Sequence, residues 1–145
     1  MGLDGDVNAR GALQQTINGL TAGTVYTLTF AWAADQLSGR TGATTEQLQV
    51  SLGSETHLTG ILSDASQSAT AWHTATMSFT ATGSSEVLSF LSLGTPEGLP
   101  PMALLDNVSL TNTVPEPATW GLMLLGVAAV GASLRMRRRA ASVAA

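Results

Sequence analysis

Alternation of apolar and polar side chains runs through most of the chain and predicts β-strands rather than helices. It is clearest in residues 24–33, TVYTLTFAWA, where Tyr, Leu, Phe and Trp occupy every second position. A period of two places one face of a strand on a core and the other toward solvent. The other expected strands alternate in the same way or, in the fourth of them, are apolar on both faces: 12–17, 46–52, 72–80, 87–93 and 102–110.

Turn-forming residues separate these segments, most clearly at 18–23 and 82–85, which are rich in Gly, Ser and Thr. Two longer polar stretches, 35–45 and 53–71, are expected to be loops, where binding residues are often found. No segment of this region has the period of a helix. The pattern therefore predicts one all-β domain, an antiparallel β-sandwich, over residues 1–113.

The pattern changes abruptly after residue 113. Residues 118–134 carry no charge, and this run is long enough to predict one C-terminal transmembrane α-helix, though short for a bilayer core of about 30 Å. A buried helix of a soluble domain is the alternative, but such a helix is seldom apolar on every face. Residues 140–145 are expected to be a disordered tail.

The residues at the two ends of this run indicate its orientation. Trp120 lies at its start, where an indole is favoured at the membrane interface. Arginines follow its end, and their preference for the cytoplasmic side places residues 1–117 outside the cytoplasm. These arginines are Arg135, Arg137, Arg138 and Arg139. The pattern predicts a single-pass membrane protein with a cytoplasmic C-terminus and a body outside the cytoplasm.

The segment just before the run has the character of a protease substrate. Pro115 and Pro117 hold the backbone extended around Glu116, and an extended peptide is the form that a protease binds. With Val114, the uncharged run and the arginine cluster, these residues resemble the PEP-CTERM sorting signal of Gram-negative bacteria over residues 114–139. The resemblance implies that the membrane is the inner membrane, that the body is periplasmic, and that an exosortase, a membrane protease, cleaves the chain. It also implies display at the cell surface or secretion, and an association with exopolysaccharide or biofilm.

Charge and composition narrow the classes of function. Residues 1–117 hold two arginines against all ten carboxylates of the chain, a formal charge of −8. Nucleic acid is excluded as a partner, because binding its phosphates requires a basic surface. The chain has no Cys, which excludes disulfides, thiolate metal sites and a Cys nucleophile. No hydrolase or phosphate-loop motif occurs, so the protein is not expected to be an enzyme.

The body also resembles a family. The segment LDGDVNARGALQQTINGLTAGTVYTLTFAWA, residues 3–33, is similar to "choice-of-anchor C" extracellular domains, which are similar in turn to galactose-binding-like jelly rolls. The resemblance implies a jelly-roll-like sandwich. Family members carry a signal peptide and further strands before this segment, whereas residues 1–11 have no apolar signal region. We therefore expect that the natural chain begins upstream of Met1.

Asp106 is the first candidate site residue. It alternates in phase with Leu104 and Val108, which predicts that its carboxylate points inward and needs a partner. The resemblance to jelly-roll domains implies a structural calcium at such an Asp of the last strand, although no cofactor is required. The alternative is an Asp at a strand edge or a bulge that binds backbone amides or Asn107.

The segment Asp4–Asn8 begins like a D-x-D-x-N calcium loop but then departs from it. Ala9 stands where Gly is required, and Gln15 stands where a bidentate Glu is required. We therefore expect a solvated turn here rather than a calcium loop.

Trp72 is the second candidate. It is out of phase with Met77 and Phe79, and packing in the core across a bulge is the favoured interpretation, while an exposed platform for a sugar ring is the alternative. Trp32 is expected in the core. His57 and His73 lack the spacing of a metal site and are expected on the surface.

Two functions are consistent with this sequence. The first is an exported structural or matrix protein of the cell envelope. The second is a carbohydrate-binding module that binds polysaccharide through the sandwich loops or Trp72.

Overall fold

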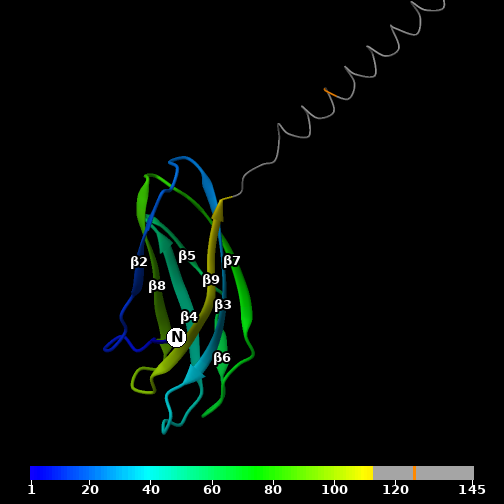
Figure 1. Cartoon of the computed structure of the whole chain (residues 1–145). Coiled ribbons are helices and arrows are strands. Elements are labelled where there is room, and N and C mark those ends of the chain that lie inside the picture. Colours follow the sequence, from blue (N-terminus) through cyan, green and yellow to red (C-terminus); the bar gives the residue numbers. More distant parts are fainter. Residues whose placement is uncertain (113–125, 127–145) are drawn as a thin grey trace, which may run out of the picture. The chain divides into compact units, whose positions relative to one another are not determined.

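The computed structural model describes residues 1–112 and residue 126. Residues 1–112 form strands and turns, with all strand pairs antiparallel, so the all-β prediction is confirmed for this part of the chain (Figure 1). The strands in chain order are β1 (Gly2–Asp4), β2 (Leu13–Asn18), β3 (Val25–Gln36), β4 (Thr44–Leu52), β5 (Glu55–Leu58), β6 (Leu62–Asp64), β7 (His73–Thr80), β8 (Ser85–Thr95) and β9 (Pro101–Asn112).

These strands make two sheets. One sheet has the order β1-β9-β3-β7, and the other has the order β2-β8-β4-β5. Strand β6 pairs with the first residues of β4. The expected loop 53–71 therefore contains two short strands, β5 and β6. Their runs of three and four residues are too short to show a clear alternation in the sequence.

The core lies between the sheets and follows the alternation of the longest strands. In β3, Leu28 and Phe30 are fully buried, and Trp32 is 3% exposed, as expected. Phe30 meets Phe90 of β8 edge-on, with ring centroids 5.2 Å apart. This contact joins the two sheets through the preferred T-shaped geometry of aromatic rings.

A β-bulge interrupts the pairing of β9 with β3. Asp106 pairs with Ala31 and Ser109 pairs with Thr29, so two residues of β9 face one residue of β3. Asn107, inside the bulge, has a φ of 51°. The bulge reverses the alternation of β9: Ala103 and Leu105 are buried before it, and Leu110 packs on the core after it.

The inward orientation expected for Asp106 is therefore wrong. The residue is exposed, and its Oδ1 accepts a hydrogen bond of 2.8 Å from the N–H of Asn107. The alternative of an Asp at a bulge is the arrangement found. Counting every second residue through 102–110 failed because one extra residue shifts the phase of everything after it.

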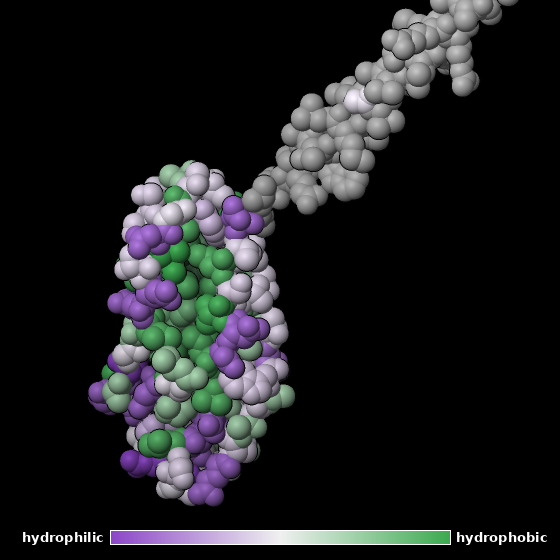
Figure 2. All heavy atoms as spheres, viewed as in Figure 1, coloured by the Kyte–Doolittle hydropathy of each residue, from purple (hydrophilic) through white to green (hydrophobic). Residues whose placement is uncertain are grey.

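Figure 2 shows a strip of apolar side chains along the side of the sandwich where β2 and β8 approach β9. A hollow of about 260 Å³ lies in this strip between the two sheets. Its apolar lining consists of Leu13, Leu88, Phe90 and Val108. Part of the core is therefore open to solvent on this side.

Candidate functional site

A groove of about 660 Å³ lies where the edge of one sheet faces the edge of the other. Strand β7, at the edge of the first sheet, forms one wall, and β5, β6 and their connection form the opposite wall. The groove is lined mainly by hydroxyl, imidazole and apolar side chains: Trp32, His57, Leu58, Thr59, Gly60, Leu62, His73, Thr74, Ala75, Thr76, Met77 and Ser78.

The groove is elongated because a strand forms its wall. Six consecutive residues, 73–78, contribute to it. At about 3.3 Å per residue they extend over roughly 17 Å. Alternation along β7 gives this wall two kinds of side chain. Ala75 and Met77 are half-buried against the core, whereas Thr74, Thr76 and Ser78 are exposed. Successive side chains of a strand point to opposite faces, so Ala75 and Met77 face the interior of the groove and the hydroxyl groups lie along its outer rim.

Glu55 holds His57 in place in the opposite wall of the groove. Its Oε2 accepts a hydrogen bond of 2.7 Å from the N–H of Thr80, and its Oε1 lies 3.0 Å from Nε2 of His57. The hydrogen bond from Thr80, followed by that from His57, lowers the pKa of the Glu55 carboxyl. The His57 ring also meets Phe79 edge-on, with centroids 4.9 Å apart. His57 is therefore held between a carboxylate and an aromatic ring.

The two histidines are both exposed, as expected, but the sequence did not indicate that they share one groove. They are 16 positions apart, and the pairing of β7 with β3 and of β5 with β4 brings them to the same place. Among residues 1–112, no three His, Asp or Glu side chains gather as a metal site.

Trp72 is 52% exposed and directly precedes the groove residue His73. The favoured interpretation, packing in the core, is therefore wrong, because a core indole would be almost fully buried. Whether its exposed ring binds a sugar stays a prediction.

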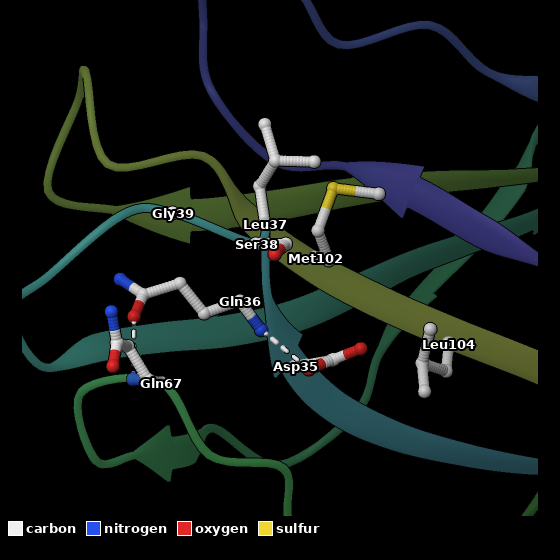
Figure 3. A pocket seen from close by; sticks show the side chains of 8 residues that line it. All are labelled: Asp35, Gln36, Leu37, Ser38, Gly39, Gln67, Met102 and Leu104. Carbon is white, nitrogen blue, oxygen red and sulfur yellow. Dashed lines mark hydrogen bonds between the residues drawn. The ribbon is translucent and has the colours of Figure 1, made fainter.

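A second hollow, of about 560 Å³, lies at the end of the sandwich where the segments 35–45 and 53–71 come together. Figure 3 shows Gln36 and Gln67 side by side, and Oε1 of Gln36 accepts a hydrogen bond of 2.8 Å from the N–H of Gln67. Nε2 of Gln36 donates to the carbonyl of Gly42 at 2.9 Å. The amide of Gln36 is thus occupied in joining the two segments.

The interior of the sandwich is polar near this end. Four polar side chains on its inner faces are at most 3% exposed: Thr44, Glu46, Asp64 and Ser92. Burial is the main cause that raises the pKa of Glu46 to about 7; the nearby Thr44 hydroxyl opposes this rise, and the negative charges of Asp64 and Asp35 contribute to it. In the sequence, Glu46 stands in phase with Leu48, Val50 and Leu52, and this signal would have identified it as an inward carboxylate.

The turn at Asp4–Asn8 is not simply solvated. Asp6 is 6% exposed, and its Oδ1 accepts a hydrogen bond of 2.9 Å from the N–H of Asn8. Its Oδ2 accepts one of 2.6 Å from the N–H of Gly98. The expectation of a solvated turn is wrong for Asp6. Its partner Gly98 lies 92 positions away in the sequence, so the local pattern could not indicate this hydrogen bond.

The expected sorting motif, membrane helix, arginine cluster and tail lie outside the described residues. They comprise Val114, Pro115, Glu116 and Pro117, residues 118–134 with Trp120, the arginines 135 and 137–139, and residues 140–145. Within the described residues, no helix has the length and apolar character needed to cross a membrane. The first compact unit of the chain is Met1–Thr113.

The chain matches the model of a known protein family. The model of a family described as "protein of unknown function (DUF642)" matches residues 5–111. The chain belongs to the DUF642 family. This DUF642 domain is followed by a match to the PEP-CTERM protein-sorting motif at residues 113–139, which confirms the resemblance of the tail. The motif indicates exosortase-dependent sorting of a secreted protein that is held at the membrane transiently.

The DUF642 chain is similar to the EclA C-terminal domain, a sugar-binding protein, at 22% identity and a TM-score of 0.46, covering 74% of this chain and 68% of that one. It is similar to a structure described as "CBM4 structure and function" at 18% identity and a TM-score of 0.40, covering 70% and 61%. No curated protein matches the chain significantly.

Proposed function

We propose that this protein is an exported carbohydrate-binding domain that binds a polysaccharide in the groove between β7 and β5–β6. The observation that carries the proposal is the groove itself. It is about 660 Å³ in volume, and its lining residues carry hydroxyl, imidazole and apolar side chains. An indole that is 52% exposed adjoins it in the sequence.

Each part of this lining matches one part of a sugar. Hydroxyl and imidazole groups exchange hydrogen bonds with sugar hydroxyls, while the C–H face of a sugar ring packs on apolar and aromatic surface. An elongated groove accepts a chain of rings rather than one ring. His57 is held in place by Glu55 and Phe79, so less side-chain entropy is lost on binding.

Retention on polysaccharide tests this proposal. The full chain would be run through a gel or column containing the exopolysaccharide of its source bacterium. We expect Trp72→Ala and Thr76→Ala each to weaken retention, and Trp72→Ala by about tenfold, or about 1.4 kcal/mol. Gln67→Ala, in the hollow at the end of the sandwich, is the matched control and should leave retention unchanged.

The outcomes separate the two functions considered. If Gln67→Ala weakens retention and Trp72→Ala does not, the end hollow binds the sugar and the groove does not. If the unaltered protein is not retained on any polysaccharide of its source, the protein is a structural or matrix component of the envelope.

Processing of the tail is the second part of the proposal. We infer that an exosortase cleaves near Pro115–Pro117 and that residues 118–134 span the inner membrane only until then. The match at residues 113–139 supports this. Intact-mass measurement of surface-displayed protein should show loss of the arginine cluster, and Glu116→Ala should reduce that loss. Surface-displayed protein that still carries the cluster would contradict cleavage.

A further inference from the structure

The polar end of the interior is built from three strands of one sheet. Thr44 and Glu46 belong to β4, Asp64 to β6 and Ser92 to β8. Thr44 pairs directly with Asp64, so their side chains start from neighbouring positions on the same face. Glu46 pairs with Gly94 on its other side, which places Ser92 diagonally across from it. The register therefore gathers four oxygen-bearing side chains, which we call the inner oxygen cluster.

Most oxygens of the inner oxygen cluster have no hydrogen-bond partner. This holds for both carboxylate oxygens of Glu46, for Oδ2 of Asp64, and for the hydroxyls of Thr44 and Ser92. The other carboxylate oxygen of Asp64 accepts a hydrogen bond of 2.5 Å from Ser68. Buried polar groups are nearly always paired in folded proteins, so five orphaned oxygens in one place need an explanation.

No basic side chain compensates the two carboxylates. Residues 1–112 contain two arginines, Arg10 and Arg40, and no lysine. The ion pair between Glu55 and His57 is the salt bridge found within these residues, and it lies in the groove. Two buried carboxylates without a counter-charge carry a large desolvation cost.

The facing sheet contributes small side chains at this end. Gly94, which pairs with Glu46 in the same sheet, lies directly against Pro101 of β9 in the facing sheet. The next inward pair along the facing sheet is Ala34 and Ala103, which pair with each other and are fully buried. Small residues here leave the carboxylates without an apolar ring packed on them, in contrast to the Phe30–Phe90 contact elsewhere in the core.

We propose that the inner oxygen cluster is a binding site for a hard divalent cation of the calcium class. Such a cation takes oxygen ligands, including carboxylates and neutral oxygens, and water completes its coordination. The site would be formed by two carboxylates and two hydroxyls. A search for three acidic or imidazole side chains therefore does not detect it. It lies on strands β4, β6 and β8 and is separate from Asp106, which is exposed on the bulge of β9.

Thermal unfolding of the full chain in a mild detergent tests the proposal. The midpoint would be compared in EDTA and in about 5 mM calcium, which exceeds the 0.1–1 mM range typical of extracellular calcium modules. We expect calcium to raise the midpoint by roughly 5 °C. Glu46→Gln and Asp64→Asn should each abolish this rise, and Asp106→Asn, the matched control, should preserve it. Calorimetric titration should give one calcium per chain.

The readout is the response to calcium, so a change in baseline stability of the variants does not affect it. An unaltered protein whose midpoint is the same in EDTA and calcium would overturn the proposal, and buried water would then satisfy the cluster. A calcium response that survives in Glu46→Gln, or that disappears in Asp106→Asn, would place the ion elsewhere. Carbohydrate retention does not enter this test, so either proposal can fail alone.

Discussion

Asp6 is hydrogen-bonded to Gly98 across 92 positions of the sequence, at 2.6 Å between Oδ2 and the backbone nitrogen. The same carboxylate binds the N–H of Asn8 through Oδ1, and Nδ2 of Asn8 donates to that oxygen at 3.1 Å. The carboxylate of Asp6 thereby ties the connection after β1 to the connection between β8 and β9. These hydrogen bonds lower the pKa of Asp6.

Replacing Asp6 should loosen both connections. In Asp6→Ala the N–H groups of Asn8 and Gly98 lose their acceptor, so we expect the melting midpoint to fall by roughly 5 °C. Asn8→Ala removes only the side-chain donor and should cost clearly less. Thermal unfolding followed by circular dichroism measures both. Equal midpoints for the two variants would contradict the role assigned to Asp6.

Stability at acid pH should depend on Glu86. Its Oε1 accepts hydrogen bonds from the hydroxyl and N–H of Thr82, each 2.6 Å, and from the N–H of Gly83 at 3.1 Å. These bonds, the Thr82 hydroxyl first, lower its pKa from the ordinary value of 4.5. A lowered folded pKa stabilises the protein above about pH 4.5, and this contribution is lost as pH falls further.

The matched variant is Glu86→Gln, which keeps the shape of the side chain but does not titrate. Its free energy of unfolding should be lower than that of the unaltered chain at neutral pH, and the difference should shrink as the pH falls below about 4.5. Denaturant unfolding at several pH values measures this. A difference that grows as pH falls would have the wrong sign.

The backbone conformation in the bulge of β9 should limit which residues are tolerated at position 107. Asn107 has a φ of 51°, a left-handed conformation that Asn and Gly tolerate and β-branched residues do not. We expect Asn107→Val to destabilise the fold by about 1–2 kcal/mol and Asn107→Gly to be nearly neutral. Urea unfolding compares them. A Val variant as stable as the Gly variant would show that the bulge can relax.

Removing the contact of Phe30 with Phe90 should lower the free energy of unfolding more than most single substitutions do. Phe30 is fully buried, and Phe30→Ala should destabilise the protein by about 3–5 kcal/mol through lost transfer energy and the cavity left behind. Phe30→Leu keeps most of the volume and should cost less. Guanidinium unfolding provides both values, and a small loss for Phe30→Ala would mean that the sheets close over the cavity.

Much of the fold could be predicted because alternation is a local property. The buried faces of β3 and β4 follow it residue by residue, and the sandwich was expected from it. Prediction failed where one residue changed the local geometry, as at Asn107. It also failed where strands were too short for a pattern, as in β5 and β6. Asp106 was misplaced for the first reason, and the groove was not foreseen for the second.

The sequence alone determined the sorting motif and the inward or outward face of most strands. A protease recognises a short linear peptide, and alternation depends on neighbouring residues only, so neither requires knowledge of distant contacts. Only the tertiary structure decided that His57 and His73 share a groove, and that Asp64 joins Glu46 inside the sandwich. These arrangements depend on which strands pair and in what register, and long-range packing determines both.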